Sequence, residues 1–338
     1  MRDITDVVQN TFPGKRVVIV GDMVADQFLN GSIARVSREA PVFILRHEET
    51  ATLAGGAANA AVNVASLGGN PVLIGVTGTD ENGGLLLDAL DIAGVDCGFV
   101  VTSDKLRTTT KVRVLAGQQY APRQQVIRID YENPSALDDD IKAALRENLA
   151  AACTSADAII ISDYNYGVAN VEMVDLAREI SCEKGIPLLI DSRFRLREFA
   201  GATSATPNQE EVEQILGKDF TAEGCDALRE ELGYEALLVT CGNKGMILAE
   251  KGREPVFMDA IGSKEPVDVT GAGDTVIAVY ALALASGMSF AGAADIANHA
   301  GGVVVMKKGT AFVNPRELLD SINSAKRTQA SDAGAAQR

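Results

Sequence analysis

The sequence contains no tryptophan, only two histidines and only five cysteines in 338 residues. His47 and His299 lie far apart in the chain, so a histidine-based metal site is not expected. The cysteines, which never form a C-x-x-C pair, are Cys97, Cys153, Cys182, Cys225 and Cys241. An odd, scattered set argues against a disulfide framework or a zinc site and is typical of small buried residues in a reducing compartment. We therefore expect a cytoplasmic protein.

The chain also lacks a long uncharged apolar run and an excess of positive charge. No stretch of eighteen such apolar residues occurs, so we expect no membrane span. The polar first sixteen residues lack the apolar segment of a secretion signal. Acidic residues outnumber basic ones by 46 to 31, giving a formal net charge of −15. This charge repels nucleic acid and anionic membranes, so neither is an expected partner.

Apolar residues make up 46% of the chain, which is enough for a sizeable core. Short β-branched runs such as 16–21 and 156–164 alternate with helix-like runs such as 141–152 and 170–185. This alternation predicts βαβ units and an α/β fold with a doubly wound, mostly parallel sheet flanked by helices. We expect one domain over residues 1–325 and a disordered tail over 326–338.

Two segments, at about 32–53 and 108–131, have a different pattern. They alternate apolar with polar or charged residues, which is typical of a sheet with one face in water. We interpret them as two insertions that form a small antiparallel β lid over the site and pair with a second copy of the chain. The alternative is a set of edge hairpins on the main sheet.

The run Asp268-Val269-Thr270-Gly271-Ala272-Gly273-Asp274-Thr275 precedes a dozen apolar or small residues that end at Gly287. Its glycines allow a tight turn and the close approach of a ligand. The first turn of a helix has unpaired N–H groups that bind anions, and it keeps a carboxylate such as Asp274 ionised. An anion site beside a carboxylate base suits phosphoryl transfer to a hydroxyl. An ordinary helix start is the alternative interpretation.

Further polar residues follow predicted turns and strands. Asp26 comes shortly after the strand at 16–21, and Gly55-Gly56 opens a small-residue helix with Asn59 one turn in. Several later strands end in polar residues, namely Asp163, Asp191, Asn208 and Thr240. Because ligands of open α/β sheets bind outside the carboxyl ends of the strands, these residues mark one candidate edge.

In order and spacing, these motifs resemble the ribokinase-like (PfkB) family of sugar and nucleoside kinases over roughly residues 15 to 320. The stretch from 21 to 69, with Ser162-Asp163-Tyr164 and Thr206-Pro207-Asn208, is more closely similar to the heptose-7-phosphate kinases of the ADP-heptose pathway. Those enzymes use ATP to phosphorylate the anomeric hydroxyl of a heptose 7-phosphate. They are often fused to an adenylyltransferase, whose H-x-G-H motif is missing here, so we expect only the kinase half.

The resemblance implies a role for each matching residue. Asp274 is the catalytic base, and the backbone N–H groups of Gly271, Ala272 and Gly273 stabilise the transferred phosphoryl group. The sugar is bound by Asp26, Gly55, Gly56, Asn59 and Asp163. The nucleotide is bound by Asn208, Glu211, Thr240, Gly242, Gly245 and Asn298. Asn208 and Glu211 also hold Mg²⁺ through water, and Asp268 and Thr270 bind K⁺ as in many relatives. The implied cofactors are thus ATP, Mg²⁺ and K⁺, and the implied assembly is a homodimer through the lid.

The chain departs from the heptose-kinase pattern in three places. Tyr166 replaces a lysine, Ser192 and Arg193 replace a Pro-Lys pair, and the segment 116–123 is longer than usual. Lysine, arginine and tyrosine are not equivalent at a phosphate. The candidates for binding the substrate's own phosphate are Arg35, Arg38, Lys111, Arg113, Arg123, Arg128 and Arg193.

Four other functions are alternatives to this one. A ribokinase-like enzyme could act on another sugar, a sugar phosphate or a nucleoside. A nicotinamide-dependent oxidoreductase is disfavoured because no G-x-G-x-x-G occurs, and a P-loop enzyme because no Gly-Lys pair precedes Ser or Thr. A non-catalytic sugar or nucleotide sensor is disfavoured because Asp274 and its glycine turn are both present.

Overall fold

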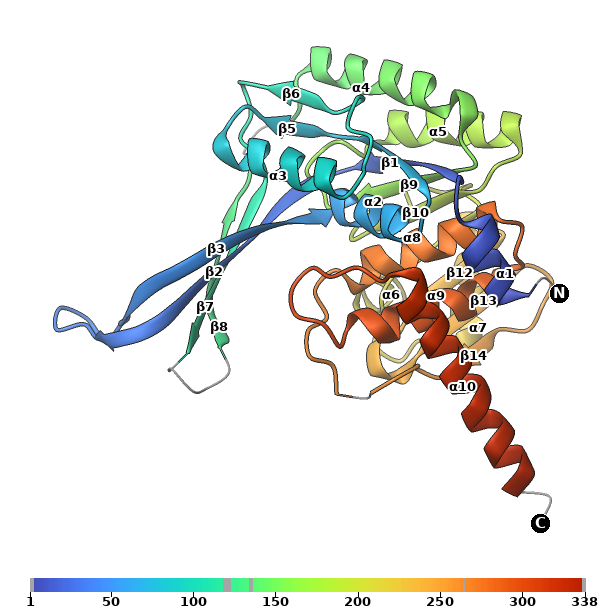
Figure 1. Cartoon of the computed structure of the whole chain (residues 1–338). Helices are drawn as coiled ribbons and strands as arrows, with labels where there is room; N and C mark the ends of the chain where they lie inside the picture. The colour runs from blue at the N-terminus through green and yellow to red at the C-terminus, as the bar shows by residue number, and fades with distance from the viewer. Residues whose placement is uncertain (1–2, 118–122, 134–135, 264, 336–338) are drawn as a thin grey trace.

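The computed structural model describes residues 3–117, 123–133, 136–263 and 265–335. A large sheet with helices on both faces forms the body, and a smaller sheet projects from one side of it (Figure 1). Most of the segment 116–123, which is longer than usual for the resembling kinases, lies outside the described residues.

The large sheet has the strand order β14-β13-β12-β11-β10-β9-β1-β4. Its parallel strands are β1 (Arg16–Gly21), β4 (Asn70–Ile74), β9 (Ala158–Asp163), β10 (Leu188–Ser192), β11 (Ser204–Ala205) and β12 (Ala236–Thr240). At one edge, β13 (Met246–Glu250) and β14 (Val256–Met258) pair antiparallel. The predicted mostly parallel, doubly wound sheet is confirmed.

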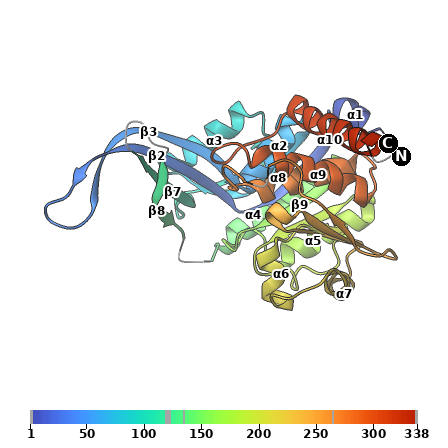
Figure 2. The same ribbon diagram turned by 90° about the horizontal axis from the view of Figure 1, so that it is seen from below.

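Successive residues of the buried strands face opposite cores. In β1, Val17 and Ile19 pack into one core, while Val18 and Val20 pack into the other. The first core is covered by α2 (Ala57–Ser66), α8 (Ala272–Ala285), α9 (Phe290–Val304) and α10 (Pro315–Ala335). The second is covered by α4 (Asp139–Ala152), α5 (Val171–Lys184), α6 (Gln209–Leu216) and α7 (Ala222–Leu232). Figure 2 shows the two helical layers on opposite sides of the strands.

The remaining elements are shorter or lie at the margins of the sheet. They are α1 (Ile4–Asp6), η1 (Val7–Thr11), α3 (Glu81–Ile92), η2 (Cys153–Ser155), η3 (Gly242–Lys244) and the parallel pair β5 (Val76–Gly78) and β6 (Val101–Ser103).

The smaller sheet, here called the lid, consists of β2 (Met23–Val36), β3 (Phe43–Gly56), β7 (Thr110–Gly117) and β8 (Gln124–Tyr131) in the order β3-β2-β7-β8. Two antiparallel hairpins are joined by the parallel pair β2–β7. The predicted lid from two insertions is confirmed, as a sheet separate from the main one. It begins at Met23, ahead of the predicted residue 32, because β2 follows β1 after Asp22 alone and its first residues are buried.

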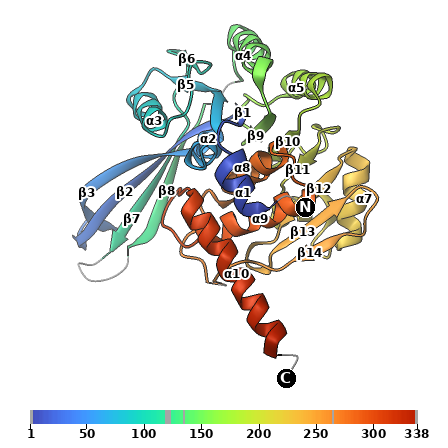
Figure 3. The same ribbon diagram turned by 45° about the vertical axis from the view of Figure 1, so that its right-hand side comes forward.

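Two features of the structure, the C-terminal tail and the cysteines, differ from what the sequence analysis predicts. Helix α10 continues to Ala335, so the tail predicted to be disordered from 326 is helical up to that residue, as its content of good helix formers allows (Figure 3). Of the cysteines, which were all expected to be buried, Cys182 is exposed and Cys97 is half-buried. Within the described ranges, no helix is long and apolar enough to cross a membrane.

Candidate active site

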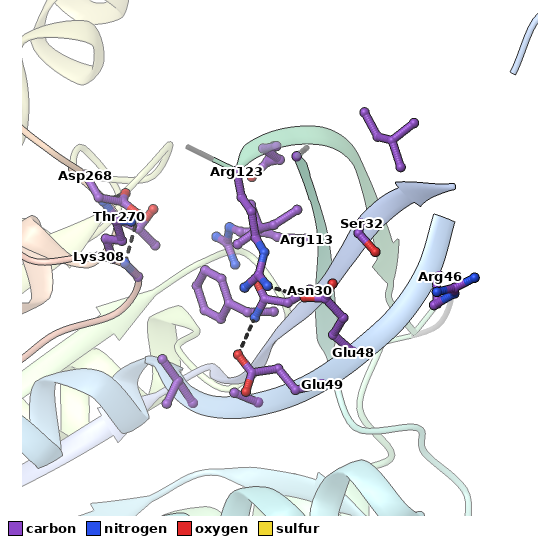
Figure 4. Close-up of a pocket in the computed structure, with 18 of the residues that line it drawn as sticks. Asn30, Ser32, Arg46, Glu48, Glu49, Arg113, Arg123, Asp268, Thr270 and Lys308 are labelled. Carbon is purple, nitrogen blue, oxygen red and sulfur yellow. Dashed lines mark hydrogen bonds and ion pairs between the residues drawn. The ribbon is translucent and has the colours of Figure 1, made fainter. Parts of the chain in front are cut away.

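Two pockets lie on either side of the turn that precedes α8. The first has a volume of about 1310 Å³, lies between the lid and the body, and is lined by Asp268 and Thr270 of this turn. Figure 4 shows Arg113 and Arg123 on the lid wall of this pocket and Lys308 on the wall formed by the body. The second has a volume of about 660 Å³ and is lined by Ala272 and Gly273. Two ligands bound in these pockets would therefore meet at the turn.

The two glycines of the turn have different surroundings. Gly271 adopts φ +77°, and a Cβ there would lie 2.5 Å from Asn59 Nδ2. A Cβ on Gly273 would meet no heavy atom within 4 Å. The fold therefore requires glycine at 271, whereas at 273 the missing side chain leaves space for a ligand.

The backbone N–H groups of the turn are also unequal. The N–H of Ala272 donates to the Val269 carbonyl at 3.2 Å. Those of Gly271 and Gly273 have no acceptor within the described part of the chain. Of the three groups expected to bind the phosphoryl group, these two are free to do so.

Asp274 lies in the first turn of α8 and is 2% exposed. Its carboxylate accepts a hydrogen bond from Asn59 Nδ2 at 2.9 Å and one from the Tyr164 hydroxyl at 2.7 Å. Burial raises the pKa of Asp274 to about 6, although both hydrogen bonds oppose this shift. The carboxylate is thus ionised at neutral pH and close enough to its pKa to accept a proton.

Asn59 is held in place by the start of α2. Gly56 precedes this helix with φ +59°, and a Cβ there would lie 2.6 Å from the Asp22 carbonyl oxygen. Asn63 donates to Asn59 Oδ1 at 3.2 Å, which leaves the Asn59 amide nitrogen directed at Asp274 and at the Gly271 carbonyl. The di-glycine turn therefore positions a hydrogen-bond donor for the carboxylate.

Asp26 lies in β2 at the base of the lid and is buried. Its carboxylate pairs with Arg113 of β7, and a Cβ on Gly55 would lie 2.7 Å from its Oδ2. The charge of Asp26 contributes to raising the pKa of Asp274. The structure thus gathers four of the five predicted sugar-binding residues, Asp26, Gly55, Gly56 and Asn59, around Asp274.

The fifth, Asp163, lies at the end of β9. Its carboxylate is fully buried and pairs with Arg195, and it also accepts a hydrogen bond from the Ser192 hydroxyl at 2.7 Å. These groups and the Asn165 N–H engage both oxygens, so the Asp163 carboxylate stabilises the end of β9, and its contact with a sugar stays a prediction.

The next residue, Tyr164, is a site residue that the sequence analysis did not assign. Its ring lies beneath two cations, Arg193 at 4.6 Å and Lys111 at 5.4 Å from the centroid, while its hydroxyl binds Asp274. The strand-end argument that selected Asp163 applies equally to Tyr164, because Tyr164 is the first residue after β9.

The second pocket contains five of the predicted nucleotide-binding residues, which are Asn208, Thr240, Gly242, Gly245 and Asn298. Its lining also includes the apolar residues Met246, Ile261, Val276 and Val305, which suit a flat base. Gly245 has φ +111°, and a Cβ there would lie 1.9 Å from the Met258 carbonyl oxygen, so the fold requires glycine. Asn298 donates to the Asp259 carbonyl at 2.8 Å.

Asn208 and Glu211 form a capping box at the start of α6. The Glu211 N–H donates to Asn208 Oδ1 at 3.0 Å, and the Asn208 N–H donates to Glu211 Oε2 at 2.8 Å. Burial and the charge of Glu211 hold the pKa of Asp191 well above its usual range. A divalent cation would relieve this repulsion, so the donor chemistry fits Mg²⁺. In the described ranges, no three His, Cys, Asp or Glu side chains form a ready-made metal site.

Asp268 accepts hydrogen bonds from the N–H groups of Thr270 and Gly309, each at 2.9 Å. Partial burial acts to raise the pKa of Asp268, but these hydrogen bonds outweigh burial and lower the pKa below its usual value. The carboxylate is therefore ionised and compatible with a nearby monovalent cation.

This chain matches the pfkB family of carbohydrate kinases over residues 15–317, and it belongs to that family. It is accordingly a phosphotransferase with an alcohol group as acceptor, a sugar kinase with an ATP-dependent kinase fold.

The bifunctional protein HldE of Caulobacter vibrioides is 38% identical over 333 residues, which cover 96% of this chain and 67% of that protein. The protein of the same name from Aeromonas salmonicida is 39% identical over 325 residues, covering 94% and 66%. The chain therefore spans about two thirds of the length of these relatives.

Solved structures show the same fold at lower identity. Arabidopsis thaliana ribokinase complexed with ribose and ATP has a TM-score of 0.67 and 22% identity, covering 91% of this chain and 98% of that one. Escherichia coli phosphofructokinase-2 in complex with potassium has a TM-score of 0.72 and 17% identity, covering 91% and 97%.

Proposed function

We propose that this kinase transfers the γ-phosphoryl group of ATP to the anomeric hydroxyl of a heptose 7-phosphate. The observation that carries the proposal is the position of Asp274 at the glycine turn. This turn lines the lid pocket on one side and the second pocket on the other. The choice of sugar is supported by the motifs that resemble heptose-7-phosphate kinases and by the 38% identity to HldE.

In this mechanism, Asp274 accepts the proton of the attacking hydroxyl while Asn59 and Tyr164 hold its carboxylate in place. Phosphoryl transfer passes through a loose transition state, so positioning and charge stabilisation contribute most of the acceleration. The free N–H groups of Gly271 and Gly273 would bind the phosphoryl oxygens at the positive end of α8.

The second pocket would take the nucleotide, with Asn208, Thr240, Gly242, Gly245 and Asn298 around it. Glu211, Asn208 and the neighbouring Asp191 would hold Mg²⁺ through water, and the ion would neutralise charge on the ATP phosphates. Asp268 and Thr270 would bind K⁺ beside the turn. The lid would close over the sugar and exclude water, which otherwise competes as an acceptor.

We further propose that the chain forms a homodimer through the lid. Strand β8 is an edge strand and carries exposed Val126, Ile127, Ile129 and Tyr131, and the tip of the β2–β3 hairpin carries exposed Val36, Val42 and Phe43. An apolar edge strand is a ready surface for pairing with a second chain.

A screen of acceptors tests the proposed substrate. The purified chain with ATP and Mg²⁺ should release ADP fastest with D-glycero-D-manno-heptose 7-phosphate, and much more slowly with hexoses, ribose or nucleosides. Faster turnover of another acceptor would identify that acceptor as the substrate in place of the heptose, and the proposed kinase chemistry would be unchanged. Nucleotide binding without turnover of any acceptor would favour the alternative function, a non-catalytic sugar or nucleotide sensor.

A further inference from the structure

Asp22 is a buried carboxylate at the junction of the body and the lid. It is the one residue between β1 and β2, is 1% exposed, and makes no ion pair within the described ranges. Burial raises the pKa of Asp22 to about 6, although hydrogen bonds from three backbone N–H groups oppose this shift. A buried charge outside an ion pair is costly unless hydrogen bonds satisfy it. These three N–H groups are therefore the partners that hold the ionised carboxylate.

The three donors belong to the segment that follows β9. The N–H groups of Tyr164 and Tyr166 donate to Asp22 Oδ2 at 2.8 Å and 2.9 Å, and that of Val168 donates to Oδ1 at 3.1 Å. A carboxylate has about four acceptor sites, whereas an amide or hydroxyl oxygen has about two. A carboxylate can therefore accept all three bonds, and asparagine or serine cannot.

The backbone that Asp22 holds has an unfavourable conformation. Asn165 has φ +65° and is the only non-glycine residue with a positive φ in the part of the chain that the structure describes, and Gly167 has φ +103°. The left-handed region is unfavourable for a residue with a Cβ. Because Asp22 binds the N–H groups on both sides of Asn165, its carboxylate stabilises this turn and the direction in which Tyr164 leaves it.

Asp22 also contacts the second element that supports Asp274. The N–H of Ala57, the first residue of α2, donates to the Asp22 carbonyl at 3.1 Å, and α2 carries Asn59. The Tyr164 hydroxyl and Asn59 Nδ2 are the two side-chain donors to the Asp274 carboxylate. Asp22 thus holds the Tyr164 segment through its side chain and the start of α2 through its backbone.

We propose that Asp22 is a positioning residue for phosphoryl transfer, whose carboxylate holds the turn after β9 so that the Tyr164 hydroxyl stays bonded to Asp274. This inference rests on the proposed function, in which Asp274 is the base. Asp22 lines neither the lid pocket nor the second pocket, so it acts through Tyr164 and not on a ligand. Loss of its carboxylate should therefore lower kcat without changing the KM for ATP.

The test is a double-mutant cycle of Asp22→Asn and Tyr164→Phe, measured at pH 7 with the acceptor that the screen identifies. Asparagine keeps the shape of the side chain but replaces one oxygen with an NH2 group, so at least one of the three bonds is lost. We expect Asp22→Asn to lower kcat about threefold or more. In the Tyr164→Phe background, the same substitution should change kcat less than about 1.5-fold, because the hydroxyl that it displaces is already absent. Asp22→Ser is a second variant and should show the same coupling.

Asp80→Asn is the matched control. The Asp80 carboxylate likewise accepts two backbone N–H groups, from Gly83 at 3.0 Å and from Thr108 at 2.8 Å, but it lines neither of the two pockets. This variant should keep kcat within about 1.5-fold of the wild type in both backgrounds. Melting temperatures measured for all variants separate a loss of folded protein from a loss of turnover.

The crystal structure of Asp22→Asn gives a readout that needs no acceptor. The Tyr164 hydroxyl should lie more than about 3.5 Å from the Asp274 carboxylate, beyond hydrogen-bond distance. Three results would overturn the inference: an unchanged bond in that structure, wild-type kcat in both Asp22 variants, or additive effects of Asp22→Asn and Tyr164→Phe. Near-normal turnover of Asp274→Asn would overturn the proposed function as well. An inactive Asp274→Asn beside fully active Asp22 variants would overturn the inference alone.

Discussion

The hydroxyl of Tyr164 donates a 2.7 Å hydrogen bond to the carboxylate of Asp274, joining the end of a buried strand to the start of α8. This bond favours the ionised carboxylate and opposes the effect of burial on its pKa. Tyr164 thereby lowers the pKa of Asp274, the group that is proposed to accept the proton.

The Tyr164→Phe variant should raise the pKa of Asp274 further. A hydrogen bond to a charged group contributes about 1.5–3 kcal/mol, which corresponds to an upward shift of roughly one pKa unit or more. The acidic limb of the profile of kcat/KM against pH, placed near pH 6 in the wild type, should move up accordingly. Tyr166→Phe, which removes a hydroxyl bonded to Glu132, is the matched control and should leave the limb in place.

The Asp274→Asn variant should lose activity and gain stability. Loss of a general base lowers turnover by about a hundredfold or more. The folded-state pKa of about 6 lies above the usual 3.8, so ionising the buried carboxylate destabilises the fold increasingly between these values and fully above pH 6. Removing this charge should raise the free energy of unfolding at pH 7 by at most roughly 3 kcal/mol.

Thermal melting of Asp274→Asn and the wild type at pH 7 and pH 4 tests this prediction, because the variant's gain in stability should be smaller at the lower pH. Retained nucleotide binding shows that the pocket is intact. A variant with near-normal turnover would remove Asp274 from the role of base.

Alanine at 271 and at 273 should have opposite consequences. Gly271→Ala forces a residue with a Cβ into φ +77° against Asn59, so we expect a loss of at least about 1–2 kcal/mol of stability. Gly273→Ala meets nothing in the protein, so its melting temperature should be unchanged. Its methyl group would occupy the second pocket and should raise the KM for ATP. Equal melting temperatures for the two variants would contradict this account of the turn.

The Glu211→Gln variant should need more Mg²⁺. Glutamine keeps an oxygen to accept the Asn208 N–H, so the helix cap remains, but the negative charge is lost. Loss of a group that supports a bound metal typically costs about 10–100-fold in affinity, and half-maximal activity should require correspondingly more Mg²⁺. The exposed Glu223→Gln is the control, and an identical Mg²⁺ response in both would remove Glu211 from the metal site.

The Ile127→Glu variant should convert the proposed dimer to a monomer. Ile127 is 54% exposed on the edge strand of the lid, and a charge there opposes pairing with a second chain. Sedimentation velocity measures the change, with the exposed Ile92→Glu on α3 as control. A monomeric wild type would contradict the proposed assembly.

The sequence predicted features that depend on local pattern. The buried strand at 16–21, the lid segments and the turn at 271–274 were each identifiable from periodicity or residue type, and the structure has all three. Asp163 and Tyr164 could not be separated in this way, because they are neighbours at one strand end and only packing decides which one faces Arg195 and which faces Asp274.

The most direct test of the central claim is to incubate the chain with ATP, Mg²⁺ and D-glycero-D-manno-heptose 7-phosphate and to analyse the product by mass spectrometry and phosphorus NMR. The account predicts a heptose bisphosphate with the new phosphate on the anomeric oxygen, formed by the wild type and nearly absent with Asp274→Asn. A heptose 7-phosphate left unmodified by an enzyme that phosphorylates another sugar, or equal product from both proteins, would contradict it.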